Sequence, residues 1–555
     1  MENHREEKIY RPAALAGALT GAMLTAALMG VLYAGWKAAG LAFVPFDAFD
    51  WTARVLPGRL TEFVIGSMVA LIQALHLGAI STTAKRMEQA IGIFNFLIAG
   101  VIGAAILFTV LRAIGGRLAY PLGLALGMIS AVPALMISLT AGRTAKAAPA
   151  VNALWIMLTF LAWGASSAWA FRRMTLSPSG LASGGREKQG CQEQARVIRI
   201  GRRRFLVLLA GYSTLITVSG TVVGALASGL GKKGGVLRTA PGERWSAAHP
   251  LPNAGAKVLP APGTRPEFTP LEKHYRIDID TIPPEIDGRS WRLKIGGLVE
   301  KPLSLSLAEL RRYGPMHQFI TLSCISNPAG GDLISTTRWT GVSLKRLIGD
   351  WGLNPRATHL MIRSADDFYE AVALDAIRSD PRIMLTYAWD GVPLLQEHGF
   401  PLRIYIPDVY GMKQPKWIES IEAVDHWEPG YWVVRGWDEV ARMKSTSVID
   451  TVAVNSLIKS EGRTLVPVGG IAHAGARGIS KVEVKVDGGP WVEAELRTPM
   501  SGLTWVIWRY NWPFQPGRHT FTVRCYDGRG IPQITAPHDP FPGGATGLNS
   551  KTRES

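Results

Sequence analysis

The stretch Ile320–Trp339, ITLSCISNPAGGDLISTTRW, contains the signals on which the interpretation of the whole chain depends. Its first residues, Ile320–Leu322, are apolar and β-prone, which predicts a short buried strand. Cys324 stands where that strand should end, and the segment Asn327–Gly331 after it must turn. A thiol at a strand end, with Arg338 close behind, suits a bound anionic group or a soft metal ion. On this stretch alone, Cys324 could equally be a small buried hydrophobe.

Length, charge and cysteine count narrow the class of protein. A chain of 555 residues has room for about three domains. The formal net charge of +17 would suit a nucleic-acid-binding protein, but the positive residues are unevenly placed. Much of the basic excess lies in loops between apolar runs that precede residue 231, a pattern typical of membrane proteins. We therefore expect no nucleic-acid partner. Three cysteines, Cys191, Cys324 and Cys525, are too few for a disulfide framework.

Six apolar runs predict a helical transmembrane bundle over residues 1–235, with the lipid bilayer as its partner. Each run reaches the ~20 residues that a helix needs to cross the hydrocarbon. The second run is less apolar than the others because it contains Glu62, Gln73 and His76. His76 is the only histidine in any of the six runs. Paired haem ligation inside the bundle is therefore not expected, whereas an anchoring or a quinone-facing role is compatible with it. The expected spans are Pro12–Ala34, Leu60–Ile80, Ile91–Leu111, Leu118–Leu139, Val151–Ala170 and Phe205–Leu230.

The loop between the fifth and sixth spans sets the expected orientation. It carries many more Lys and Arg than Glu residues, so the positive-inside rule places it in the cytoplasm. The sixth span then delivers everything after Lys233 to the outer side, and six spans would put the N-terminus outside as well. We therefore expect a multi-pass protein of a bacterial cytoplasmic membrane, with its catalytic domain on the extracytoplasmic, periplasmic side.

The same loop ends in Arg202-Arg203-Arg204-Phe205-Leu206, directly before an apolar run. This segment is similar to a twin-arginine export signal placed inside the chain. The twin-arginine route carries folded domains already loaded with a cofactor, which would suit a metal cofactor inserted in the cytoplasm. An ordinary basic flank before a membrane span explains the same residues.

The remainder of the chain predicts a linker, two folded domains and a tail. Ser306 and Glu309 form a capping box in a region where short helices alternate with strands, which predicts a mixed α+β domain. Strict alternation in Lys481–Asp487, followed by turn signals, predicts a C-terminal β-sandwich with Cys525 in its core. The expected boundaries are 236–270 for the linker, 271–455 for the mixed domain, 456–540 for the sandwich and 541–555 for a flexible tail.

Two later stretches share the chemistry of the first. Glu397–Arg403 puts a histidine and an arginine around a turn into a strand, and Tyr410–Trp417 puts two lysines and two aromatic residues around a loop. Cationic side chains and backbone donors on loops form cradles for oxyanions or phosphates. Solvated loop charges are the alternative interpretation of Lys413 and Lys416.

These motifs together resemble the sulfite oxidase family of molybdopterin enzymes. The resemblance covers about residues 270–540, and several spaced motifs in the right order carry it. The matching motifs are Tyr275–Asp278, Leu322–Asn327, Gly330–Asp332, Arg338–Val342, Glu397–Arg403, Tyr410–Lys413 and Lys416–Trp417.

The resemblance implies a mononuclear molybdenum held by a pterin dithiolene and one protein thiolate. Cys324 matches that thiolate, so it is the expected metal ligand and would set the electronics of the metal. The resemblance also implies an immunoglobulin-like C-terminal domain that mediates dimerisation, and hence a homodimer. The residues expected to bind the cofactor are Tyr275, Arg276, Asp278, Cys324, Asn327, His398, Arg403, Gly411, Lys413 and Lys416.

Two departures from the family pattern concern the substrate. Sulfite oxidases follow the cysteine's Asn with an arginine that helps to hold sulfite, and Pro328 stands there in this chain. The tyrosine that those enzymes place near the metal has no clear counterpart, because Pro429 falls about where it would align. Arg276 and Arg338 are the expected orienting residues for an anionic or dipolar substrate.

The expected function is a two-electron oxygen-atom transfer at molybdenum, on a small substrate such as a sulfur oxyanion. The chain has no Cys-x-x-Cys-His haem motif, so its electrons should pass to or from an external cytochrome or quinone. A sulfoxide or N-oxide reductase of the same family is one alternative. A non-catalytic membrane adaptor with a degenerate pterin fold is another. A thiol hydrolase built on Cys324 and His398 lacks the expected nucleophile elbow.

Overall fold

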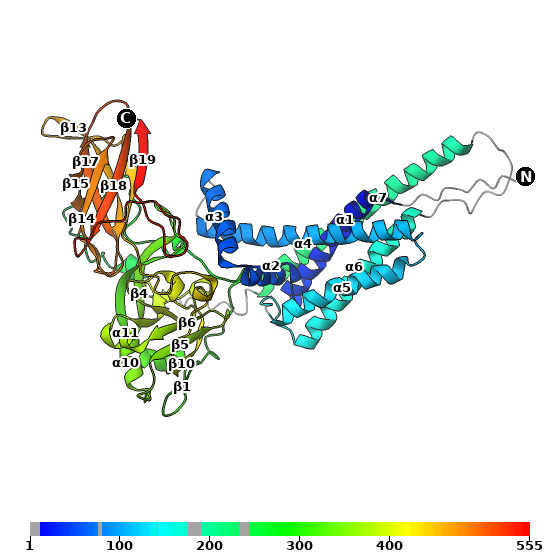
Figure 1. Cartoon of the computed structure of the whole chain (residues 1–555), viewed down its shortest axis with the longest axis horizontal. Coiled ribbons are helices and arrows are strands. Elements are labelled where there is room, and N and C mark those ends of the chain that lie inside the picture. Colours follow the sequence, from blue (N-terminus) through cyan, green and yellow to red (C-terminus); the bar gives the residue numbers. More distant parts are fainter. Residues whose placement is uncertain (1–11, 76–79, 141, 176–189, 232–243, 555) are drawn as a thin grey trace, which may run out of the picture. The chain divides into compact units, whose positions relative to one another are not determined.

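The computed structural model describes residues 12–75, 80–140, 142–175, 190–231 and 244–554 (Figure 1). The chain forms two compact units. The first is helical and consists of Met1–Val55, Lys85–Val236 and Asp280–Ile282. The second contains Leu56–Ala84, Leu237–Ile279 and Pro283–Ser555, and holds every described strand.

The helices of the first unit pack through small residues. A Cβ atom on Gly30 of α1 would lie 2.7 Å from the Cα atom of Thr217 in α7, and one on Gly164 of α6 would lie 2.1 Å from the carbonyl oxygen of Gly123 in α5. Close backbone approach at glycines is how apolar helices gain packing energy in a bilayer. The helices are α1 (Ala14–Ala39), α2 (Val44–Val55), α4 (Ile80–Ala113), α5 (Ala119–Thr140), α6 (Pro149–Thr175) and α7 (Gly190–Gly231).

Five helices in the described part of the chain are long and apolar enough to cross a membrane, namely α1, α4, α5, α6 and α7. The second of the six expected runs does not reach this length in the described residues, where it forms α3 (Gly58–Ala74), a helix of only 17 residues. At 1.5 Å per residue such a helix is about 26 Å long, short of the ~30 Å hydrocarbon core. His76 lies outside the described residues.

The mixed domain of the second unit contains two five-stranded sheets. Their strand orders are β2-β1-β10-β5-β6 and β3-β4-β7-β8, with β9 also paired to β7. The first sheet comprises β1 (Leu293–Gly297), β2 (Leu303–Leu305), β5 (His359–Ser364), β6 (Tyr369–Ala373) and β10 (Ile418–Val424). The second comprises β3 (Met316–Ser323), β4 (Ile334–Ser343), β7 (Met384–Trp389), β8 (Val392–Pro393) and β9 (Arg403–Tyr405).

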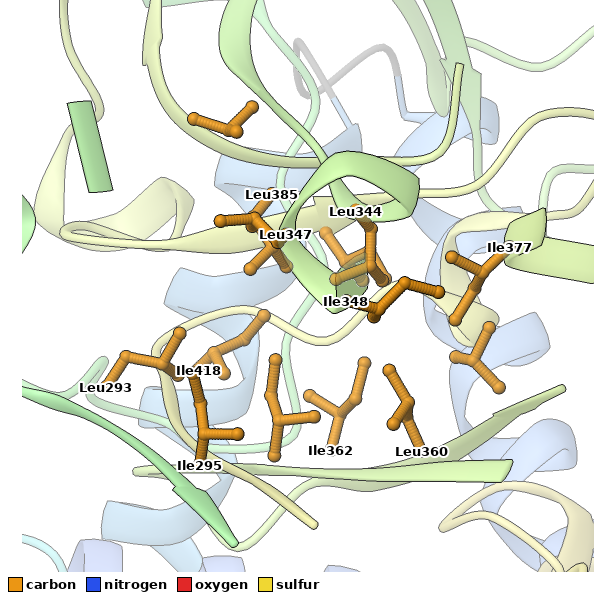
Figure 2. Packing of buried hydrophobic residues seen from close by; sticks show 14 of the residues in the cluster. Leu293, Ile295, Leu344, Leu347, Ile348, Leu360, Ile362, Ile377, Leu385 and Ile418 are labelled. Carbon is orange, nitrogen blue, oxygen red and sulfur yellow. The ribbon is translucent and has the colours of Figure 1, made fainter. Parts of the chain in front are cut away.

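A single apolar core joins these two sheets. Figure 2 shows Leu344 and Leu347 of α10 (Leu344–Gly349) facing Ile362 and other strand residues of the first sheet. Two further short helices are α9 (Leu307–Arg312) and α11 (Leu374–Ser379). The predicted capping box is confirmed, because the Ser306 and Glu309 side chains each accept a hydrogen bond from the other's backbone N–H. The expected mixed α+β architecture is therefore confirmed.

The C-terminal strands form two sheets that pack face to face around one core, so the expected β-sandwich is present. Val466 and Trp508 from one sheet meet Val484 and Phe521 from the other, and Cys525 is fully buried among them as expected. The first sheet comprises β11 (Thr446–Val452), β12 (Ile458–Ser460), β13 (Arg463–His473), β16 (Glu495–Leu496) and β17 (Val506–Pro513). The second comprises β14 (Ile479–Val486), β15 (Val492–Glu493), β18 (Arg518–Asp527) and β19 (Asn549–Glu554).

Two segments expected to lack fixed structure are packed. The end of the expected tail is not free, because Asn549–Glu554 form β19 and pair with β18. In the described part of the expected linker, residues 244–270, Trp245 packs against Phe319 of the mixed domain, and later residues lie against the sandwich. There Glu267 forms a buried ion pair with Arg497 (2.9 Å), and Arg265 pairs with Asp450 (2.7 Å). The Gly and Pro content of this segment indicated a chain without periodic structure. It gives no information on ion pairs with residues far away in the sequence.

Candidate functional site

The loop that carries Cys324 is closed by hydrogen bonds at both ends. Cys324 is the first residue after β3, and its N–H donates to the carbonyl oxygen of Leu333 over 3.0 Å. Asn327 closes the other side, since its Oδ1 accepts a hydrogen bond from Leu333 N over 2.9 Å. A Cβ atom on Gly331 would lie 2.3 Å from that same Oδ1, so a side chain there would break the closure. The thiol is held in place and is 7% exposed.

Two tyrosines lie close to the segment that carries Cys324, since Tyr410 packs in one cluster with Ile325 and the Tyr275 hydroxyl lies near Gly411. Burial raises the pKa of Tyr275, and the charge of Cys324 raises it further. Burial likewise raises the pKa of Tyr410 to about 12, with Cys324 as a smaller cause. Tyr275 is fixed because its N–H donates to Ser335 Oγ over 2.9 Å. The Tyr410 hydroxyl accepts a hydrogen bond from the N–H of Lys444 over 3.1 Å. Both phenols therefore stay protonated near neutral pH and can donate hydrogen bonds.

Gly411 begins the 3-10 turn Gly411–Lys413 and brings the backbone close to Tyr275 and to Ser323, the last residue of β3. A Cβ atom on Gly411 would lie 3.1 Å from the Tyr275 hydroxyl and 3.5 Å from the carbonyl oxygen of Ser323. The family pattern gave no clear counterpart for the tyrosine that sulfite oxidases place near the metal. Tyr275 and Tyr410 both occur in the motifs quoted above, but a linear pattern gives no indication that both side chains lie close to the Cys324 segment.

A cluster of cationic side chains begins at Arg276, the residue after Tyr275. Arg276 Nε donates to Asp278 Oδ2 over 2.7 Å, and Lys416 Nζ lies 3.7 Å from the same oxygen. Lys416 also donates to the carbonyl oxygen of Ile277 over 2.9 Å. Burial lowers the pKa of Lys416 to about 8, and the charges of Arg403 and Arg276 add to that effect. An anion bound here would raise the Lys416 pKa again, because its negative charge would offset the repulsion from Arg403 and Arg276.

Arg403 and His398 complete the cluster. The Arg403 guanidinium donates to the carbonyl oxygen of His398 over 3.2 Å and stacks over Trp339 at 4.9 Å. Burial lowers the pKa of Arg403 to about 10. Burial also holds the pKa of His398 well below its usual value, helped by His274 and the three nearby cations. His398 is therefore neutral, whereas the arginine remains charged.

The cluster contains buried polar atoms that suit a bound anionic heterocycle. Within the described residues, Arg276 Nη2, Trp339 Nε1 and Trp389 Nε1 are buried donors without a hydrogen-bond partner. His274 Nδ1 donates to the Tyr275 carbonyl oxygen over 3.1 Å, which leaves Nε2 as an unpartnered acceptor in the neutral ring. Buried polar groups in folded proteins are nearly always paired. A pterin with a phosphate group offers both acceptors and donors, so these residues fit such a cofactor.

Lys413 does not belong to the cluster in this structure. Its ammonium group donates to Glu370 Oε1 over 2.7 Å, and both side chains are buried. Burial raises the pKa of Glu370, and the neighbouring ammonium partly offsets this rise. The sequence predicted Lys413 and Lys416 as equivalent cradle residues, whereas the structure gives them different partners.

Arg338 lies away from the thiol. In the β3–β4 register, Ser323 pairs with Ile334 and Phe319 pairs with Arg338, so Arg338 stands four residues, or ~13 Å, farther along the sheet. Its guanidinium stacks over Trp245 at 5.1 Å, and its carbonyl oxygen accepts from Asp390 N. Closeness in sequence to Cys324 was misleading, because the two antiparallel strands carry Arg338 back along the sheet.

Comparison with known proteins places this site in a recognised domain type. Residues 280–432 match the family model described as the oxidoreductase molybdopterin binding domain. Mitochondrial sulfite oxidase of Rattus norvegicus is 29% identical over 271 residues, covering 41% of this chain and 50% of that protein. Mitochondrial sulfite oxidase of Homo sapiens is 27% identical over 303 residues, covering 46% and 55%. Nitrate reductase [NAD(P)H] of Hordeum vulgare is 25% identical, covering 42% and 32%.

The chain spans about half the length of the sulfite oxidases it matches. The crystal structure of sulfane dehydrogenase SoxCD from Paracoccus pantotrophus is similar with a TM-score of 0.46 and 21% identity, covering 52% of this chain and 81% of that one. The family model and the curated relatives support a molybdenum-dependent oxidoreductase and imply a molybdopterin cofactor. The expected enzyme class is thus confirmed at this level.

Proposed function

We propose that the chain is a membrane-anchored molybdopterin oxidoreductase that moves an oxygen atom, in a two-electron reaction, to or from a small substrate outside the cytoplasm. One observation carries the proposal. The segment that carries Cys324 lies close to two protonated tyrosines, and the residue after Tyr275 begins a buried cationic cluster. When bound, the molybdenum cofactor would supply the two-electron redox chemistry.

Each part of the site would then have a separate task. The sulfur of Cys324 would be the protein ligand of the metal. Arg276, Arg403 and Lys416 would hold the phosphate and the pterin with His398, while Asp278 keeps Arg276 and Lys416 in position. Gly411 would allow the backbone to approach the cofactor. Asn327 would act through the loop rather than by direct contact, because its side-chain oxygen already accepts from Leu333 N.

The hydroxyl groups of Tyr275 and Tyr410 would hold the substrate oxygen. Both stay protonated near neutral pH, so each can donate a hydrogen bond to an oxygen that gains negative charge during transfer. The positive charge of Arg276, whose side chain would contact the cofactor, would also attract an anionic substrate. A small sulfur oxyanion is therefore the first candidate substrate class.

A sulfoxide or N-oxide is the second candidate, and a specific observation favours it. Pro328 replaces the arginine that sulfite oxidases are expected to use on the anion. Two neutral donors beside the thiol suit the single polarised oxygen of a dipolar substrate as well as they suit a dianion. In that case the enzyme would run as a reductase.

The membrane part of the proposal rests on the five apolar helices. With α7 delivering the second unit to the periplasm, five spans would leave the N-terminus in the cytoplasm, opposite to the side expected for six. Export by the twin-arginine route would follow from Arg202 and Arg203. An external cytochrome or quinone would exchange electrons with the metal, and the C-terminal sandwich, as an immunoglobulin-like domain, would mediate a homodimer.

Metal analysis of the purified full-length protein tests the proposal. We expect about one molybdenum per chain in the parent protein and almost none in Cys324→Ser. Turnover would then be measured with sulfite, dimethyl sulfoxide and trimethylamine N-oxide. A metal-free protein from cells that make the cofactor would favour the non-catalytic adaptor instead.

A further inference from the structure

His473, the last residue of β13, lies on the side of the sandwich that packs against the mixed domain. Two residues earlier on the same strand face, Ile471 is buried in a cluster with Ile334 of β4. Ile334 pairs with Ser323, the residue before Cys324. Side chains two apart in a strand point to the same face. His473 therefore points toward the mixed domain, close to the strand end that carries the thiol.

Contacts on the neighbouring strand support the same placement. His473 pairs with Thr446 of β11, and two residues before Thr446 the N–H of Lys444 donates to the Tyr410 hydroxyl. The charge of Arg477 affects the pKa of both His473 and Tyr410. Tyr410 in turn packs in one cluster with Ile325, the residue after Cys324, so His473 lies in the surroundings of the proposed substrate position.

The turn after His473 is rigidly attached to the segment before Tyr410. Arg477 forms an ion pair with Asp408, lies 3.1 Å from Asp527, and donates to the carbonyl oxygen of Met443 over 2.7 Å. A Cβ atom on Gly475, which has a φ of +60°, would lie 2.3 Å from Asp408 Oδ1. These contacts fix the position of the imidazole relative to the site.

The imidazole has unused hydrogen-bonding capacity. His473 is 2% exposed, and within the described part of the chain neither Nδ1 nor Nε2 has a hydrogen-bond partner. Burial lowers the pKa of His473 to about 3, so the ring is neutral and offers one donor and one acceptor. Leaving both atoms unpaired in the protein interior is unfavourable, which points to a small polar ligand.

We propose that His473 binds the polarised oxygen of the substrate, as a residue that the C-terminal sandwich contributes to the oxygen-transfer site. This inference rests on the proposed function. The ligand class is a small molecule with an oxygen on sulfur or nitrogen. The sandwich would then help to set specificity, in addition to any role in dimerisation.

The test compares His473→Ala with His473→Gln in the full-length, molybdenum-loaded protein. Binding of sulfite and of dimethyl sulfoxide to the oxidised protein is measured by calorimetry, and KM and kcat are measured for whichever is turned over. Loss of one neutral hydrogen bond should raise Kd and KM roughly three- to tenfold in His473→Ala, with little change in kcat. His473→Gln, which keeps a donor and an acceptor, should recover most of the affinity. His519→Gln, in the same sandwich but paired with Asp487, is the matched control.

The outcomes separate this inference from the proposed function. Unchanged Kd and KM in His473→Ala, at parental molybdenum content, would overturn the inference and leave the enzyme assignment intact. Loss of molybdenum or of thermal stability in both His473 variants would mean a structural role, such as holding a buried water, and would also overturn it. Absence of molybdenum, or of binding of both probes, in the parent protein would overturn both.

Discussion

The Lys413 ammonium group donates a hydrogen bond over 2.7 Å to Oε1 of Glu370, whose carboxylate is fully buried. Lys413 was expected to hold the cofactor phosphate, and in the structure it is paired with this carboxylate instead. Lys416, three residues later, lies instead in the cationic cluster with Arg276 and Arg403. The two lysines should therefore respond differently to substitution.

Replacing Lys413 alone should destabilise the second unit. Lys413→Met leaves the Glu370 carboxylate buried without its cation, which typically costs about 3–5 kcal/mol of folding free energy. The double variant Lys413→Met/Glu370→Leu should recover most of the thermal stability and keep its molybdenum, whereas Lys416→Met should lose molybdenum. Thermal melts and metal analysis of the three variants decide the matter. Loss of metal from the double variant would make Lys413 a cofactor ligand after all.

Arg338 should be dispensable for catalysis and Arg276 should not. The Arg338 guanidinium stacks over Trp245, whereas Arg276 lies in the cationic cluster beside Asp278. Arg338→Ala should keep molybdenum content and KM within about twofold of the parent, since surface cation–π contacts are worth only about 0.5–1 kcal/mol. Arg276→Ala should lose cofactor. A KM increase above tenfold in Arg338→Ala would show that Arg338 does bind the substrate.

Both tyrosines beside the thiol should matter for turnover but not for metal retention. Tyr275→Phe and Tyr410→Phe each remove one hydroxyl donor and keep the ring that packs in the site. Loss of one preorganised donor commonly lowers kcat by on the order of 100-fold. Steady-state kinetics at equal molybdenum content measures this. Tyr405→Phe, which changes a buried tyrosine on β9, is the control. Parental kcat in both site variants would exclude the hydroxyls from the reaction.

The stability of the protein should fall on acidification below about pH 6.5. Burial lowers the pKa of His274 to about 3, whereas in the unfolded chain it is ~6.5. Between these values the unfolded state binds a proton that the folded state excludes, so stability is complete above the unfolded value and is lost as pH falls. At pH 5 the cost is about 2 kcal/mol for this residue.

A His274→Gln variant isolates that contribution. Its melting temperature should depend less on pH between 7.5 and 5 than that of the parent, while His538→Gln, on an exposed segment, should behave like the parent. Identical pH dependence in parent and His274→Gln would mean that His274 is accessible to protons in the folded state.

Export of the second unit should require the paired arginines before α7. Replacing Arg202 and Arg203 with Lys should leave the metal-loaded second unit in the cytoplasm, where added protease cannot reach it in spheroplasts. Replacing Arg172 and Arg173 with Lys at the end of α6 keeps the same charge and serves as the control. Normal protease accessibility after the Arg202 and Arg203 changes would rule out the twin-arginine route.

The local features of the fold were predictable from the sequence because they depend on neighbouring residues only. Apolar run length predicted the helices α1, α4, α5, α6 and α7, and a period of two predicted the strands of the sandwich. The serine and glutamate of the capping box act within one turn of helix. The run that forms α3 was overestimated because polar residues interrupt it and the helix ends after 17 residues.

The sequence by itself determined that a thiol follows a buried strand, that cationic loops accompany it, and that apolar helices precede it. Only the tertiary structure decided which side chains share the site. It brought Tyr275 and Tyr410 to Cys324, gave Lys413 to Glu370, carried Arg338 back along the sheet, and directed His473 from the sandwich toward the mixed domain. These partners are distant in the chain, and strand register and sheet packing choose between them, so no local period or propensity encodes the choice.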